Sequence, residues 1–431
     1  MEKWRKITLF IGDGLSLCIA GYLMLISRFG LKQAPNEIPL HLKPFIIWGI
    51  LVFLIFYIFN LYETSALKPT LGNIRQFIFA IIVSAITGIM LFYLFPFSIA
   101  PKTNLLITQL YFTFLILFWR RSFYRLFSKR FKNNIAFIGE TPESKILIKN
   151  IIDNPPIGYE YQGTFESFEM LKKSNLKINT VVYASGNNTI DLIELSKSNY
   201  IHLDISKAFQ IILSKIPVSL MNDTLALNII ENRRNFLYNS MKRFIDILFS
   251  SLLLVTTLPI TLLAMLARYL EDGRPFFIRQ KRIGKTGRIF TLYKLRSMQA
   301  LAPDGSAEIA GVQWASENDP RITPVGKIIR KLHIDEIPQM FNILRGDITI
   351  VGPRPERPEF VSMLEKEIPY YFLRHTIKPG FTGWAQIKYR YARTIEDSKE
   401  KFEYDLYYIK NRNFFLDMGI IVRTVQIIFT H

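Results

Sequence analysis

Long apolar runs with few charged residues dominate the first part of the chain. Each run approaches or reaches the roughly 20 residues that a helix needs to cross a bilayer. Buried helices of a soluble bundle do not explain the pattern, because nearly uncharged runs in succession leave no polar face to meet water. The pattern therefore predicts four transmembrane helices within residues 1–130, over Ile7–Ile26, Pro44–Leu61, Phe77–Phe97 and Leu105–Trp119.

Basic residues at both ends of this region indicate its orientation. Lys3, Arg5 and Lys6 precede the first run, and a larger basic cluster over residues 120–132 follows the fourth. Positive residues collect on the cytoplasmic side of a membrane, so with an even number of spans both clusters should face the cytoplasm. The basic residues within 28–43 argue mildly for the opposite side, and the larger cluster outweighs them.

Residues 131–238 have a different pattern, in which short apolar runs alternate with charged helical segments. This alternation predicts a Rossmann-like α/β domain with a mostly parallel sheet. The expected strands are Ile135–Gly139 and Thr180–Ala184, and the expected helices are Glu143–Ile152 and Ile190–Ser198. The loop after the first strand has one glycine where a dinucleotide-binding loop has three, and Glu140 would face a pyrophosphate. A structural or regulatory domain is therefore favoured, with nucleotide binding as the alternative.

The third region, residues 239–431, opens with another long apolar run, Ile247–Ala267, that contains Pro259. Proline removes a helical hydrogen bond and clashes with the preceding turn, so a bend is expected at this residue. Basic residues outnumber acidic ones on both sides of the run, which places both flanks in the cytoplasm. A re-entrant membrane helix over about 244–270, broken at Pro259, is therefore favoured over a fifth span.

The stretch from Arg330 to Pro355 places two adjacent carboxylates, Asp335 and Glu336, among arginines. Neighbours on a helix project about 100° apart, so these carboxylates should have different roles rather than share a proton. One could attack phosphorus or hold a metal ion while the other completes the site, with guanidinium groups on the phosphate oxygens. The alternative is a surface ion pair between Asp335 and Lys331, which would not require Pro338 or the G-P-R-P turn that follows.

Two strand-like basic runs lie upstream, within Gly273–Met298, and a polar segment, Ala302–Asn318, is predicted to be a mobile loop over the site. Downstream, a turn-rich segment offers Lys378, Gly380, Thr382 and Gly383 as ligand contacts, and Asp405 is a further candidate.

The composition limits the classes of partner that are expected. The net charge is +19, with 49% hydrophobic and 14% aromatic residues, so membrane segments coexist with basic soluble parts. Nucleic acid is not expected as a partner, because the basic residues flank apolar runs instead of lining one helix with stacking aromatics. The single cysteine, Cys18, excludes a disulfide within the chain. No cleavable signal peptide is expected, since the first apolar run is too long.

Several motifs in the last 190 residues occur together in one order, namely F-I-R-Q-K-R-I-G, Y-K-L-R-S-M, D-P-R-I-T, L-H-I-D-E-I-P-Q, G-D-I-T-I-V-G-P-R-P and I-K-P-G-F-T-G-W-A-Q. Together with the proline-broken apolar run they resemble the bacterial sugar transferases, specifically the monotopic polyprenyl-phosphate glycosyl-1-phosphate transferases. The N-terminal spans and the α/β domain resemble the large subclass of this family. Ile337, Leu295 and His333 depart from the commonest motif residues without removing a charged group.

The resemblance implies a reaction in which a UDP-sugar, with glucose or galactose as the first guess, gives its sugar-1-phosphate to undecaprenyl phosphate and UMP is released. It implies that Asp335 forms a covalent phosphosugar, that Glu336 takes the neighbouring acid role, and that both hold Mg²⁺ or Mn²⁺. Arg330 completes the catalytic set. The phosphate and nucleotide contacts expected are Lys294, Arg296, Arg321, Arg354, Arg357 and Lys378.

By the same resemblance, the protein starts exopolysaccharide, capsule or O-antigen synthesis at the cytoplasmic face of the bacterial inner membrane. Its further partners would be the bilayer, a second copy of the chain and polysaccharide-assembly machinery. Two other functions stay open from the residues: an inverting glycosyltransferase that releases UDP, and a non-catalytic assembly scaffold.

Overall fold

The computed structural model describes residues 2–62, 67, 70–95, 101–127, 133–153, 158–184, 197–231, 236–301, 319–389 and 394–429. The chain divides into two compact units, Met1–Ala208 and Phe209–His431. The polar loop predicted at Ala302–Asn318 and most of the helix predicted at Ile190–Ser198 lie outside the described residues.

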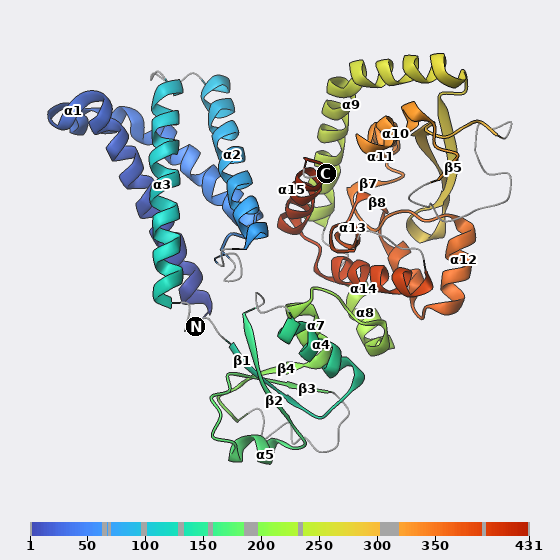
Figure 1. Ribbon diagram of the computed structural model, residues 1–431, viewed down its shortest axis with the longest axis horizontal. Coiled ribbons are helices and arrows are strands. Elements are labelled where there is room, and N and C mark those ends of the chain that lie inside the picture. The colour runs from blue at the N-terminus through green and yellow to red at the C-terminus, as the bar shows by residue number, and fades with distance from the viewer. Residues whose placement is uncertain are drawn as a thin grey trace. The chain divides into compact units, whose positions relative to one another are not determined.

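The first unit begins with three helical elements, α1 (Glu2–Ile58), α2 (Leu71–Leu94) and α3 (Pro101–Phe127), drawn in blue to cyan in Figure 1. The first two predicted apolar runs both fall in α1, which is kinked at Gly30 (φ 77°, ψ 162°) and has no loop between them. Glycine tolerates this backbone conformation because it has no Cβ.

Within the described residues, three helices are long and apolar enough to cross a membrane: α1 from Lys6, α2 from Gly72, and α9 (Phe236–Asp272). The prediction of four N-terminal spans therefore corresponds to two such helices in this unit, the first of them kinked. The fourth predicted run lies in α3, which does not reach that hydropathy because it includes Asn104, Gln109 and Arg120.

A buried ion pair joins α3 to α1. Arg120 lies 2.6 Å from the Asp13 carboxylate, and both side chains are buried. A second guanidinium nitrogen of Arg120 donates to the carbonyl oxygen of Leu61 at 2.8 Å. Charged groups inside a membrane bundle require such partners, so Asp13 and Arg120 serve the packing of this bundle.

The α/β part of the first unit contains a four-stranded parallel sheet, in the order β2-β1-β3-β4. Its elements are β1 (Asn133–Ile138), α4 (Pro142–Asp153), β2 (Tyr159–Phe165), α5 (Phe168–Lys173), β3 (Thr180–Tyr183) and β4 (Ile201–Asp204). Ala136, Ile138 and Val181 of the two central strands are buried against Phe168 and Leu171 of α5. The sequence prediction of an α/β sheet domain is confirmed.

The second unit mixes short strands with helices. Its helices after α7 (Ile205–Ile212) are α8 (Asp223–Glu231), α9, α10 (Pro324–Lys331), α11 (Gln339–Arg345), α12 (Pro358–Glu367), α13 (Trp384–Lys388), α14 (Ile395–Asn411) and α15 (Phe414–Phe429). The strands β5 (Phe277–Ile283) and β6 (Ile289–Leu295) form an antiparallel hairpin, and β7 (Thr349–Val351) pairs in parallel with β8 (Gly380–Thr382).

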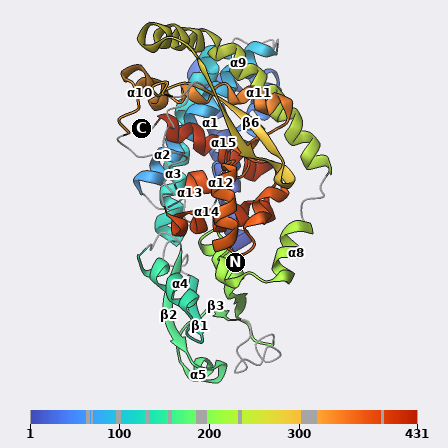
Figure 2. The ribbon, with the colours of Figure 1, turned by 90° about the vertical axis from the view of Figure 1, so that its right-hand side faces the viewer.

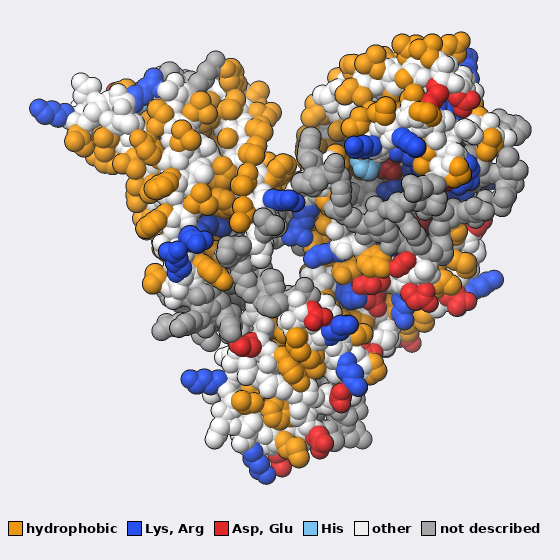
Figure 3. Space-filling view, viewed as in Figure 1, with side chains coloured by type: hydrophobic (Ala, Val, Ile, Leu, Met, Phe, Trp, Pro, Cys, Tyr) orange, Lys and Arg blue, Asp and Glu red, His pale blue; other side chains and the backbone are white. Residues whose placement is uncertain are grey.

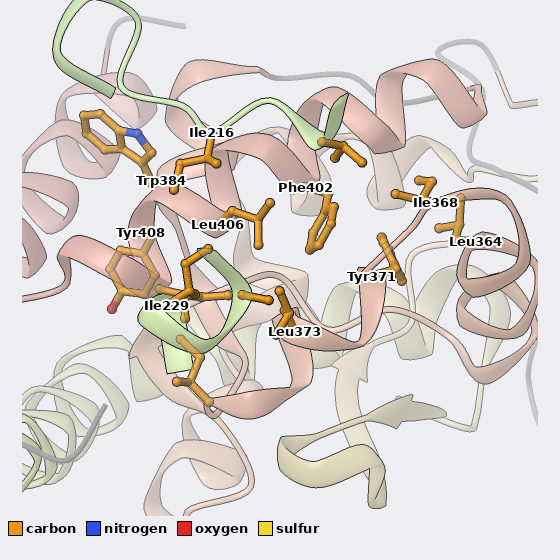
Figure 4. Packing of buried hydrophobic residues seen from close by; sticks show 14 of the residues in the cluster. Ile216, Ile229, Leu364, Ile368, Tyr371, Leu373, Trp384, Phe402, Leu406 and Tyr408 are labelled. Carbon is orange, nitrogen blue, oxygen red and sulfur yellow. The ribbon is translucent and has the colours of Figure 1, made fainter. Parts of the chain in front are cut away.

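The apolar core of the second unit forms around α14 (Figure 4). Phe402 and Leu406 of this helix are fully buried, and Ile216 and Ile229 from the chain before α9 pack beside them. The backbone amide of Ile216 also donates to the carbonyl oxygen of Glu403 at 3.0 Å. The segment that precedes the membrane helix is therefore part of this unit's core.

Helix α9 has two arms that meet at a pronounced bend (Figures 1 and 2). Pro259 is the proline within this helix, and proline is the usual cause of such a bend. Large apolar side chains cover the outer surface of α9, including Val255 (72% exposed), Leu263 (66%) and Leu270 (77%); Figure 3 shows this cover in orange.

The inner side of the second arm packs on the elements that carry the carboxylate pair. Ala264 contacts a buried cluster with Leu295, Ile329 and Ile334. Arg268 is fully buried and donates to Thr323 Oγ1 at 2.6 Å and to the carbonyl oxygen of Met298 at 3.2 Å. One face of α9 is therefore apolar and open, while the other supports the site described next.

Candidate active site

Asp335 and Glu336 lie in a short 3₁₀ turn, Ile334–Glu336, between α10 and α11. His333 precedes the turn in the left-handed conformation (φ 55°, ψ 22°), and Pro338 follows it at the start of α11. The sequence predicted a helix for this pair, and the structure places it in this tighter turn. Because Ile334 is anchored in the apolar cluster beneath α9, the two following carboxylates are fixed at the wall of a cavity.

This cavity has a volume of about 490 Å³. In Figure 3, Lys, Arg, acidic and His side chains gather below the upper arm of α9. Eight of the residues predicted from the sequence line the cavity: Lys294, Arg321, Arg330, Asp335, Glu336, Arg354, Arg357 and Asp405. Its wall therefore combines the carboxylate pair and two further acidic residues, Glu356 and Asp405, with a larger number of Lys and Arg residues, which suits a ligand with several negative charges.

Glu336 is held by two cations. Its Oε1 accepts from Lys294 Nζ at 3.1 Å and from the Arg354 guanidinium at 2.6 Å. Burial alone would raise the pKa of Glu336, but Arg354 and Lys294 outweigh it and hold this pKa well below its usual range. Glu336 is therefore ionised at neutral pH and cannot donate a proton there.

Asp335 has a different environment although it is the adjacent residue. It is 8% exposed, and no described residue donates a hydrogen bond to its carboxylate. Burial raises the pKa of Asp335, Lys294 lowers it, the Glu336 charge raises it, and the net direction is upward. A desolvated carboxylate without hydrogen-bond donors is a stronger nucleophile than a solvated one. The two adjacent carboxylates therefore lie in different environments, and the separate roles inferred from the sequence stay a prediction.

A second ion pair holds the backbone that carries Arg354. Arg374 donates to the carbonyl oxygen of Arg354 and to Asp405 Oδ2, at 3.0 Å each. Burial raises the pKa of Asp405 to about 6, although Arg374 lowers it. Asp405 and Arg374 both line the cavity. Sequence reasoning missed Arg374, since its partner lies 31 residues away and no local pattern marks the pair.

The remaining predicted cations of the cavity differ in how firmly they are held. Arg321 forms two hydrogen bonds with Asp319, at 2.8 and 2.6 Å, which fix its guanidinium. Arg357 directly precedes α12, and Arg330 lies in the last turn of α10. No described residue forms an ion pair or hydrogen bond with the Arg330 side chain, so its donors are available to a ligand.

Two predicted phosphate-binding residues do not line this cavity. Arg296 is fully buried and donates to the carbonyl oxygens of Asp272 and Gly273, at 2.9 and 2.6 Å, at the end of α9. Lys378 lines a separate cavity.

The predicted ligand-contacting glycines have a packing reason. A Cβ added at Gly380 would lie 2.0 Å from the backbone nitrogen of Gly352, and one at Gly383 would lie 2.2 Å from the Gly352 oxygen. These glycines therefore allow β7 and β8 to pair closely under the G-P-R-P turn.

Comparison with known proteins agrees with this geometry. Residues 237–431 match the family described as bacterial sugar transferase. A UDP-glucose:undecaprenyl-phosphate glucose-1-phosphate transferase of Klebsiella pneumoniae is 32% identical over 321 residues, which cover 68% of this chain and 67% of that protein. The protein with the same description from Escherichia coli is 29% identical over 324 residues, with the same coverage of each chain.

A third relative is more similar over a shorter region. The UDP-N-acetylgalactosamine-undecaprenyl-phosphate N-acetylgalactosaminephosphotransferase of Aeromonas hydrophila is 42% identical over 194 residues, which cover 45% of each chain. The cavity, the candidate membrane helices and the sequence similarity together define the class of protein. The chain belongs to the bacterial sugar transferase family, a family of membrane-associated transferases.

Proposed function

We propose that this protein transfers a sugar-1-phosphate from a UDP-sugar to undecaprenyl phosphate and releases UMP. The observation that carries the proposal is the contrast between the two adjacent carboxylates: Asp335 is buried and accepts no hydrogen bond from the described residues, while Glu336 is fixed by two cations. The relatives are described as acting on UDP-glucose and UDP-N-acetylgalactosamine. A UDP-hexose is therefore the proposed donor class.

In the first half-reaction, an oxygen of Asp335 attacks the β-phosphorus of the UDP-sugar. The bond between that phosphorus and the bridging oxygen breaks, and UMP leaves with the electron pair of this bond. The product is a sugar phosphate joined to Asp335. Arg330 and Arg321 at the cavity wall are placed to neutralise the charge that develops on the phosphate oxygens.

In the second half-reaction, a phosphate oxygen of undecaprenyl phosphate attacks the same phosphorus. The bond to Asp335 breaks, which restores the carboxylate and leaves a polyprenyl diphosphate sugar. Glu336 acts in both steps by orienting Lys294 and Arg354, because its ionised state excludes proton donation.

The described donor set fits a divalent cation held jointly with substrate. No group of three His, Cys, Asp or Glu side chains that could hold a metal is found in the described part of the chain. Mg²⁺ is often held by one or two carboxylates plus substrate phosphates, and Asp335 and Glu336 both face the cavity. Mg²⁺ bound there would neutralise diphosphate charge.

We also propose that α9 enters and leaves the membrane on the cytoplasmic face. Its bend, its open apolar surface and the basic residues on both of its flanks support this topology. The cavity would then lie where a soluble nucleotide sugar and a lipid phosphate meet.

The nucleotide product tests the reaction. Membranes that contain the protein should release UMP from the correct UDP-sugar in a donor panel, in an amount equal to the lipid product. The Asp335→Asn variant should lose activity by about 1,000-fold or more, because loss of a nucleophile removes the covalent route. Release of UDP would instead show a glycosyltransferase, and full turnover by Asp335→Asn would exclude the covalent mechanism.

A further inference from the structure

The second unit contains another large cavity that the proposed reaction does not use. Its volume is about 590 Å³, and it shares no lining residue with the active-site cavity. Five basic residues and one acidic residue are among its lining groups, drawn from α9, the turn of the β5–β6 hairpin, the segment before β8 and the end of α14. These are Lys242, Arg243, Lys285, Lys378, Arg412 and Asp246.

Lys378 is the cation of this cavity that is both partly buried and unpaired among the described residues. It is half-buried, and none of the described residues forms an ion pair or hydrogen bond with its ammonium group. A Cβ added at Gly346 would lie 3.2 Å from Lys378 Nζ and 3.7 Å from the guanidinium carbon of Arg243, so these two cations flank one point. Burial, followed by the charge of Arg243, lowers the pKa of Lys378. A bound anion would relieve this repulsion.

Acidic residues balance only part of the charge in this cavity: Lys242 forms an ion pair with Asp417 at 2.6 Å, while Asp246 forms no ion pair with a described cation. The Asp246 carboxylate accepts from Thr349 Oγ1 at 2.7 Å and from the amide of Ile350 at 2.9 Å, so its oxygens are directed to β7. Arg243 donates to the carbonyl oxygens of Ile343 and Leu344, at 2.6 Å each. These bonds neutralise no charge on Arg243, and they fix its guanidinium beside Lys378.

The position along α9 indicates the source of the anion. Lys242 and Arg243 lie on its first arm among exposed apolar side chains, Leu237 (70% exposed), Phe244 (67%) and Leu248 (52%). Basic residues beside such an apolar surface lie at the level of lipid headgroups when the helix enters a membrane. This step rests on the membrane insertion of α9 in the proposed function.

We propose that the cavity around Lys378 and Arg243 is a second phosphate-binding site, separate from the catalytic cavity, that holds the phosphate of an anionic membrane lipid. Lys378 and Arg243 bind the phosphate oxygens, and the apolar surface of α9 receives the acyl chains. Such a bound lipid would fix the first arm of α9 against β7 and the hairpin turn.

Native mass spectrometry of the full-length protein in detergent micelles tests this proposal with added phosphatidylglycerol. The wild type should retain one phosphatidylglycerol, and Lys378→Gln should bind it about tenfold more weakly because one charge-assisted contact is lost. Lys281→Gln removes the same charge from an exposed position on β5 that lines neither cavity, and should bind as the wild type. Equal binding by Lys378→Gln and Lys281→Gln would overturn the site.

Two further measurements identify the source of the phosphate. Inorganic phosphate at millimolar concentration should not displace the lipid; displacement, or binding of phosphate without lipid, would assign the site to a free anion and overturn the lipid assignment. Asp335→Asn should retain phosphatidylglycerol while it loses transfer, so failure of the two proposals can be told apart. A raised KM for undecaprenyl phosphate in Lys378→Gln, with phosphatidylglycerol binding unchanged, would place the acceptor in this cavity and contradict the proposal.

Discussion

At the scale of single residues, Lys294 connects the two carboxylates, since it pairs with Glu336 and lowers the pKa of Asp335. We predict that Lys294→Gln raises the pKa of Asp335 further, because the ionised carboxylate loses a cation that stabilises it. If Asp335 must be ionised to attack, activity is lost as the pH falls through this pKa. The acidic limb of kcat/KM against pH should therefore move to higher pH in Lys294→Gln.

The same profile measured for Lys281→Gln gives the control, because that variant loses an equal charge at an exposed position away from the cavity. Its acidic limb should coincide with that of the wild type. An unmoved limb in Lys294→Gln would show that Asp335 does not set the acidic limb.

Asp405 is predicted to be a positioning residue. It holds Arg374, which in turn holds the backbone of Arg354, the partner of Glu336. Asp405→Asn should lower kcat more than it raises KM, and should destabilise the fold by about 2 kcal/mol because a buried charge-assisted hydrogen bond is weakened. The kcat and KM values with thermal unfolding measure both effects. A loss of stability with unchanged kcat would leave Asp405 a purely structural role.

The sequence predicted much of this site because its motifs are local. Asp335, Glu336 and Arg330 lie within seven consecutive residues, so their proximity follows from the chain. Arg374 could not be found in this way, because its contacts with Arg354 and Asp405 depend on how α14 packs. Arg296 was expected to contact phosphate from the family resemblance, but it follows the last residue of β6 and donates to the carbonyl oxygens of Asp272 and Gly273.

At the scale of elements, the parallel sheet and the bend of α9 followed from periodicity and from one proline. The structure does not confirm the count of four N-terminal spans, because the first two predicted runs lie in α1, which is kinked at Gly30 where a loop was expected. Whether a loop or a kinked helix joins the two apolar runs depends here on the backbone conformation of one residue, Gly30. The segment with Ile216 and Ile229 also gave no sign in the sequence that it belongs to the core around α14.

The role of the bend in α9 can be tested by measuring on which side of the membrane the chain after this helix lies. In Pro259→Ala the lost backbone hydrogen bond is restored, so a straight spanning helix becomes about 3 kcal/mol more favourable relative to the bent one. In a Cys18→Ser background, a cysteine at the exposed position 281 should react only with reagents in the cytoplasm in the wild type. A fraction of the Pro259→Ala protein should become labelled from the periplasm.

Periplasmic labelling of position 281 in the protein that keeps Pro259 would contradict the re-entrant topology. A cysteine at Lys145, an exposed residue of α4, reports the first unit in the same experiment and should stay cytoplasmic in both proteins. This second position separates a change in α9 from a general inversion of the protein.

At the scale of the whole molecule, two parts support the chemistry in different ways. The N-terminal unit has candidate membrane helices and an α/β sheet, while the second unit contains the cavity with the carboxylate pair and matches the sugar transferase family. Within the second unit, α9 supports the carboxylate turn on one face and exposes apolar residues on the other. The lipid acceptor and the charged donor would therefore meet at one helix.

The central claim is that Asp335 forms a covalent bond to phosphorus. Purified protein incubated with the UDP-sugar, without undecaprenyl phosphate, should release about one UMP per chain. Mass spectrometry of acid-quenched peptides should find a hexose phosphate on the peptide that contains Asp335, and adding undecaprenyl phosphate should remove it. Release of UDP, or a modified peptide in Asp335→Asn at the wild-type level, would contradict the account.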